Sequence, residues 1–130
     1  RKFTESETTD TAYYRYFDVR NGQPDMDTSI DLRALPGSRP LFITGDTCCS
    51  SSSDAVSAIR LELYDAAGAF LGYAGGCTGQ SSDGDGKVVS ATPIAMQKIP
   101  ENAARLRVTV TASGEKSNSA DTNVYIYNSR

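Results

Sequence analysis

The stretch from Arg105 to Ala112, RLRVTVTA, alternates strictly between polar and apolar side chains. Successive side chains of a β-strand point to opposite faces, so every apolar residue of this stretch falls on one side of an extended backbone. In a helix, the same residues would be scattered around the circumference. A strand with one apolar and one polar face is typical of an antiparallel sheet that is covered on one side only.

Similar alternation, or a concentration of aromatic and β-branched residues, recurs along the chain and predicts about eight strands. Turn-forming residues separate these segments, most clearly in DAAG at residues 65–68, which predicts a tight hairpin. Leu, Met, Glu and Lys are too sparse to favour long helices. The expected strands are residues 12–19, 29–35, 39–45, 58–64, 69–74, 87–99 with a break near Pro93, 105–112 and 123–128.

Strands of this kind bury their apolar faces by stacking two antiparallel sheets, which predicts an all-β antiparallel β-sandwich or a jelly-roll-like arrangement. The pattern leaves the order of the strands open. A chain of 130 residues fits one domain. We expect a polar N-terminal extension at residues 1–11 and a single sandwich domain at residues 12–130. The chain begins at Arg1 without a methionine, so we expect a processed product or a cut segment.

The cysteines constrain both the core and the compartment. A bond between the adjacent Cys48 and Cys49 would be strained, so we predict one disulfide from this pair to Cys77. If the strand at 39–45 keeps its phase, Cys49 points inward, which predicts a Cys49–Cys77 bond and leaves Cys48 as a spare or intermolecular thiol. A disulfide indicates an extracellular, cell-surface or periplasmic location. One alternative is a cytosolic protein in which the cysteines are buried and reduced. Another is a zinc site, although adjacent cysteines do not match the usual spacing of zinc ligands.

The composition disfavours most classes of enzyme. The chain has no histidine, which excludes Ser–His and Cys–His nucleophile pairs and a histidine-ligated zinc. We therefore predict no enzymatic activity, with chemistry by a pair of carboxylates as the alternative. The net charge is −3 and no dense Lys/Arg patch is present, so we expect no nucleic-acid partner. No apolar run approaches the ~20 residues that span a bilayer.

Two segments rich in Asp and Asn are candidate calcium sites, because calcium prefers several oxygen ligands at close spacing. The first is QSSDGDGK at residues 80–87, and the second is NSADTN at residues 118–123. Neither matches a complete calcium loop, and an ordinary polar turn or loop is the favoured interpretation of both segments. The candidate ligands are Asp83, Asp85, Asn118, Asp121 and Asn123.

Tyrosine is the dominant aromatic residue, with 7 copies in a chain that has no tryptophan. By strand phase, Tyr64, Tyr125 and Tyr127 point away from the core. Exposed aromatic surface commonly marks a contact with a protein or a glycan, although scattered exposure without a role is the alternative. The candidate interface residues are Tyr14, Tyr16, Tyr64, Tyr125 and Tyr127.

These features predict a non-enzymatic extracellular structural or adhesive subunit, such as a pilus, filament or surface-assembly protein. Its expected partners are copies of itself, which it would contact through exposed strand edges, the tyrosines and the N-terminal extension. The alternative hypothesis is a carbohydrate-binding module or lectin, with a glycan as partner and calcium as the candidate cofactor.

Overall fold

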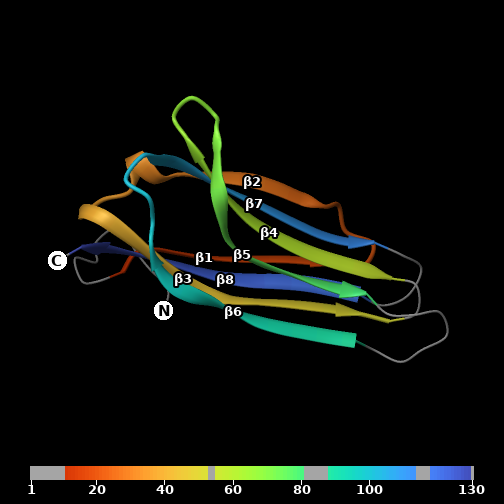
Figure 1. Ribbon diagram of the computed structural model, residues 1–130. Coiled ribbons are helices and arrows are strands. Elements are labelled where there is room, and N and C mark those ends of the chain that lie inside the picture. The colour runs from red at the N-terminus through yellow and green to blue at the C-terminus, as the bar shows by residue number, and fades with distance from the viewer. Residues whose placement is uncertain (1–10, 53–54, 81–87, 114–117, 130) are drawn as a thin grey trace.

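The protein is a two-layer sandwich of eight antiparallel strands, as the sequence predicted (Figure 1). This computed structural model describes residues 11–52, 55–80, 88–113 and 118–129. Sheet A contains the strands in the order β1-β8-β3-β6, and sheet B contains them in the order β2-β7-β4-β5. The strands are β1 (Thr11–Arg20), β2 (Met26–Asp31), β3 (Ser38–Ser51), β4 (Val56–Asp65), β5 (Phe70–Gln80), β6 (Val88–Lys98), β7 (Ala103–Ser113) and β8 (Asn118–Ser129).

The strand order defines a jelly roll, which resolves the choice that the sequence left open. The chain crosses from one sheet to the other after β1, β2 and β3, and again after β5, β6 and β7. Only the β4–β5 hairpin keeps two consecutive strands in the same sheet. Each sheet therefore pairs strands from distant parts of the chain, as two interlocked Greek keys require.

The core lies between the two sheets and is built from their inward-facing side chains. In β7 the three residues Leu106, Val108 and Val110 are fully buried, which confirms the face predicted from the alternation of residues 105–112. Phe17 and Ile126 bring larger side chains from sheet A. Burial of this apolar surface is the main force that holds the sheets together.

The disulfide joins Cys49 of β3 to Cys77 of β5, so it links sheet A to sheet B through the core. The sequence predicted this pairing from the phase of the strand, and the structure confirms it. The register between β3 and β6 shifts between Ile43 and Gly45, but the extra residue lies on β6. Because β3 itself keeps its alternation, Cys49 points inward and is fully buried.

Three expectations about local structure were wrong. The strand expected at 29–35 ends at Asp31, because Leu32–Ala34 forms a short 3-10 helix, η1, in which the Asp31 carboxylate accepts the Arg33 backbone N–H. The expected break near Pro93 is absent, since β6 is an edge strand on which a missing N–H group is tolerated. Residues 118–122, expected as a loop, belong to β8.

The domain boundaries remain a prediction. Thr11, expected in the N-terminal extension, is the first residue of β1, and residues 1–10 lie outside the described residues. In the part of the chain that the structure describes, no helix is long and apolar enough to cross a membrane.

We predict that the disulfide contributes about 3 to 4 kcal/mol to the free energy of unfolding, because it closes a 28-residue separation. Adding reductant to the wild-type protein should lower its unfolding midpoint in a urea titration. In the variant with both Cys49→Ala and Cys77→Ala, reductant should have no further effect. If reductant lowered the unfolding midpoint equally in both proteins, the Cys49–Cys77 bond would not be the cause of the destabilisation.

Candidate functional site

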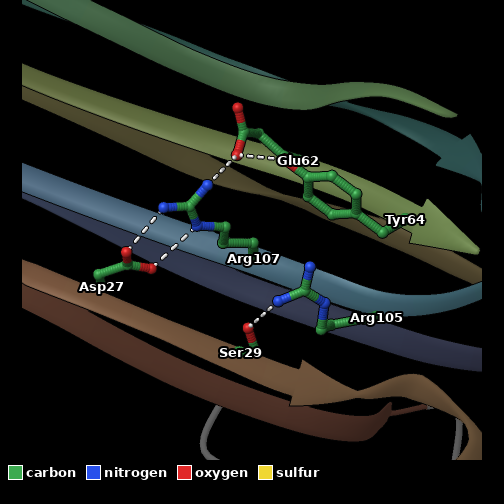
Figure 2. Close-up of polar contacts among 6 residues, drawn as sticks. All are labelled: Asp27, Ser29, Glu62, Tyr64, Arg105 and Arg107. Carbon is green, nitrogen blue, oxygen red and sulfur yellow. Dashed lines mark hydrogen bonds and ion pairs between the residues drawn. The ribbon is translucent and has the colours of Figure 1, made fainter. Parts of the chain in front are cut away.

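The outer face of sheet B carries a network of charged side chains centred on Arg107 of β7 (Figure 2). Its guanidinium donates to both carboxylate oxygens of Asp27 on β2, at 3.0 Å from Nε and 2.7 Å from Nη2. On the other side, Nη1 donates to Glu62 Oε1 of β4 at 3.5 Å. The Tyr64 hydroxyl donates to the same Glu62 oxygen at 3.0 Å. The network thus spans three neighbouring strands.

The register of the strands explains why these residues meet. Arg107 lies directly opposite Ser29 on one side and opposite Glu62 on the other. Side chains that are opposite or diagonal across an antiparallel pair lie within contact distance of each other. Hydrogen bonding to Arg107 lowers the pKa of Asp27, and the bond to Asp27 raises the pKa of Arg107. Both side chains are exposed to solvent, so salt screens this attraction.

Beside this network, a row of aromatic rings runs from β4 to the edge of the sheet. The Arg105 guanidinium lies 4.6 Å from the centre of the Tyr64 ring and donates to Ser29 Oγ at 3.2 Å. The ring of Tyr64 packs edge-on against Phe70 at 5.7 Å, and Phe70 packs against Tyr73 at 5.0 Å. We call Tyr64, Phe70 and Tyr73 the aromatic row.

Of the aromatic row, only Tyr64 was a candidate from the sequence. Phe70 and Tyr73 are more exposed, at 50% and 59%. The tight turn at 65–68 was the signal that could have found them, because it places Phe70 opposite Tyr64 and Tyr73 opposite Glu62.

An open hollow lies next to Tyr73 on the same face. Gly75 and Gly76 line it and carry no side chains that could fill it, while Arg60 forms part of its wall. Arg60 Nη1 donates to the Cys77 carbonyl at 3.3 Å, which holds the guanidinium close to β5. An aromatic ring, a cation and a bare backbone surface are suited to ligand binding.

The outer face of sheet A brings together residues that the sequence had suggested for different roles. Tyr14 of β1 packs against Tyr125 of β8, with ring centres 4.7 Å apart. The Tyr14 hydroxyl donates to Asn123 Oδ1 at 2.8 Å, and Asn123 Nδ2 donates to Asp46 Oδ1 at 2.9 Å. Asn123 is thus held by two structural hydrogen bonds.

Asp121 and Asn118 lie on opposite sides of β8, because neighbouring positions of a strand alternate between faces. Asp121 faces outward opposite Asp18, and its burial together with the charges of Asp18 and Asp46 raises the pKa of its carboxyl group. Asn118 faces inward, and its amide donates to the carbonyls of Val56 and Ser113 at 3.1 and 2.6 Å. Asn118 therefore cannot form one site with Asp121 and Asn123.

The remaining candidates are placed as follows. Tyr16 is 47% exposed on β1, and its partial burial together with the charges of Asp121 and Asp18 raises its pKa. Tyr127 is half-buried on β8. Asp83 and Asp85 lie outside the described residues. Within those residues, the structure contains no group of three or more His, Cys, Asp or Glu side chains that could hold a metal ion.

The chain matches no known protein family and no curated relative. Solved structures of infectious bursal disease virus align with most of it. The alignment with the Gx strain structure covers 92% of this chain at 12% identity, with a TM-score of 0.44. The alignment with the Gt strain structure covers 92% at 14% identity, with a TM-score of 0.43. The alignment with the structure of T=1 particles derived from infectious bursal virus covers 91% of this chain at 12% identity, with a TM-score of 0.41.

The chain spans 31 to 32% of the length of these viral chains. Likenesses this distant carry no argument about function.

We predict that Asp27 stabilises the fold only above the pH at which its carboxyl group is protonated. Its pKa in the folded protein lies below the ordinary value of about 3.9. The wild-type protein should thus have a larger free energy of unfolding than Asp27→Asn, and the full difference should be present above about pH 4. The difference should be lost as the pH falls through the folded-state pKa of Asp27. Urea unfolding of both proteins between pH 2 and 7 measures this difference, which high salt should diminish. A difference that grows on acidification would contradict the assignment.

Proposed function

We propose that this protein is a non-enzymatic structural subunit that self-associates outside the cytosol. The observation that carries the proposal is the position of its exposed apolar side chains. The described residues include five large exposed ones, and four of these lie on β5 and β6: Phe70, Tyr73, Val89 and Met96. The fifth, Tyr16, lies on β1.

β5 and β6 are the edge strands of their sheets, and they lie side by side along one margin of the sandwich (Figure 1). Gln97 Nε2 of β6 donates to the Ala74 carbonyl of β5 at 3.1 Å. A Cβ atom at Gly75 would lie only 3.1 Å from Ile94 Cγ1, which shows how closely the two strands pack. We call this margin, formed by β5 and β6, the β5–β6 edge.

An unpaired strand edge that also displays apolar side chains is a surface on which a second copy can add. Phe70 and Tyr73 are exposed on the sheet B side of the β5–β6 edge, and Val89 and Met96 on the sheet A side. A contact with another copy would cover the side chains and also pair the backbone groups that sheet A and sheet B leave at this margin.

On the opposite margin, the edge of sheet B is less suited to self-association. β2, the edge strand of sheet B there, has only 6 residues and presents the polar side chains of Asp27, Ser29 and Asp31. Short and charged edge strands resist pairing with another chain. Within sheet B, this difference favours β5 over β2 as part of the contact surface.

The mode of contact determines the kind of assembly. Two β5–β6 edges that meet each other form a closed dimer, whereas the same edge packed on a different surface of the next copy gives a ring or an open filament. The Cys49–Cys77 bond supports a location in an oxidising compartment, which is where pilus, filament and surface-assembly proteins act.

We predict that a double variant, Tyr73→Lys with Met96→Lys, remains monomeric at concentrations where the wild-type protein assembles. The two added charges would have to be buried without partners in the contact. Sedimentation velocity over a wide concentration range measures the masses, and circular dichroism checks that the variant folds.

The control is Tyr16→Lys, which places one such positive charge on an exposed side chain of β1 and should assemble like the wild type. A wild-type protein that is monomeric at every concentration would overturn the proposal. So would a double variant that assembles as the wild type does.

Carbohydrate binding is a second candidate function, favoured by the exposed Tyr73 ring beside the hollow that Arg60 borders. A sugar ring could stack on the Tyr73 face while its hydroxyl groups meet the guanidinium. We expect Tyr73→Ala to abolish any binding signal on a glycan array, and Tyr16→Ala to retain it. A signal that survives Tyr73→Ala would place the glycan elsewhere.

A further inference from the structure

A compact recess lies at one end of the sandwich, where η1, the first residues of β3 and the turn between β6 and β7 meet. Its volume is about 160 Å³. The buried side chains Leu32, Leu41, Ile99 and Ala103 form its floor, and each is less than 10% exposed. The floor is therefore apolar and belongs to the hydrophobic core itself.

The backbone around the recess is fixed by hydrogen bonds that join its walls. The Ile99 N–H donates to the Leu41 carbonyl at 2.8 Å, which ties the end of β6 to the start of β3. The Ala103 N–H donates to the Pro100 carbonyl at 2.9 Å and closes the turn into β7. The recess is thus formed before any ligand arrives, which lowers the entropic cost of binding.

Arg39 places a positive charge at the mouth of the recess. Its guanidinium donates to the carbonyls of Leu32, Leu35 and Gly37 at 3.1, 2.8 and 3.0 Å. These three bonds hold the planar group in place and leave further N–H donors, since a guanidinium carries five. Within the described residues, no carboxylate lies within ion-pair distance of Arg39.

Two other charged groups border the recess. Arg33 donates one N–H to Asp31 at 3.3 Å and keeps the rest of its guanidinium exposed. Glu101 is exposed on the turn between β6 and β7. Asp31 offsets the charge of Arg33, so Arg39 is the cation at the mouth that none of the described carboxylates pairs with.

We propose that this recess binds a compact organic carboxylate with an apolar body about the size of a benzene ring. An apolar protein cavity of about 150 Å³ accepts benzene, so the volume here suits one such ring. The body would rest on the floor formed by Leu32, Leu41 and Ile99, and the carboxylate would accept hydrogen bonds from Arg39. A charged acceptor makes such bonds stronger than a neutral one does. The recess is a separate site from the β5–β6 edge used for self-association.

The test is a titration of the folded protein with phenylacetate, followed by isothermal calorimetry and by amide shifts in NMR spectra. We expect saturable binding at one site, with the largest shifts around η1 and the turn between β6 and β7. Phenylacetamide, a neutral isostere, should bind about tenfold more weakly because it lacks the charge. Acetate, which lacks the ring, should show no saturable binding.

Three variants separate the contributions of the floor and of the charges. Ala103→Leu fills the recess and should abolish binding while every charge stays in place. Glu101→Gln removes the opposing carboxylate and should tighten binding of phenylacetate but not of phenylacetamide. Arg39→Gln should remove the preference for phenylacetate over phenylacetamide. If Arg39→Gln fails to fold because η1 loses its support, Arg33→Gln tests the role of charge through a weaker preference.

Equal binding of phenylacetate and phenylacetamide by the wild-type protein would overturn the proposal. Unchanged affinity in Ala103→Leu would do the same, as would an absence of saturable binding. None of these outcomes bears on self-association, because the sedimentation experiment reads a different surface.

Discussion

The packing of two apolar sheet faces against each other is the constraint on which the rest of this molecule depends. Every strand gives its inward positions to this core, so every other side chain has to lie on an outer face, on an edge or at an end of the sandwich. Cys49 and Cys77 reinforce the same contact with a covalent bond between the sheets. In a chain with only 38% hydrophobic residues, such a bond compensates for a modest core.

The packing of the sheets also determines which side chains face outward, and the strand register determines which of these come into contact. On sheet B, the register brings Arg107 between Asp27 and Glu62 and leaves the aromatic row to reach the open edge. The jelly-roll order then sets β5 beside β6, so that apolar side chains from both sheets border one margin. The surfaces that we propose for self-association and for ligand binding therefore lie at a margin and at one end of the sandwich.

Much of the fold could be predicted from local pattern. The number of strands, the inward phase of Cys49 and the outward phase of Tyr125 all follow from alternation, which requires only neighbouring residues. The failures occur where local pattern competes with tertiary context. The alternation of the apolar Ile30 and Leu32 with polar neighbours suggested a continuing strand, but the Asp31 carboxylate caps η1 and the strand ends there. The polar segment at 118–122 suggested a loop, yet pairing with β1 and β3 extends β8 through it.

The candidate sites show the same division. The sequence by itself determined that this chain forms a sandwich, which side chains face its core and which cysteines can meet there, because a period of two fixes the face of each residue. Only the tertiary structure decided that Tyr14 stacks on Tyr125, that Phe70 and Tyr73 share a margin with Met96, and that Arg39 borders an apolar recess. Those contacts join residues far apart in the chain, and alternation carries no information about which strands become neighbours.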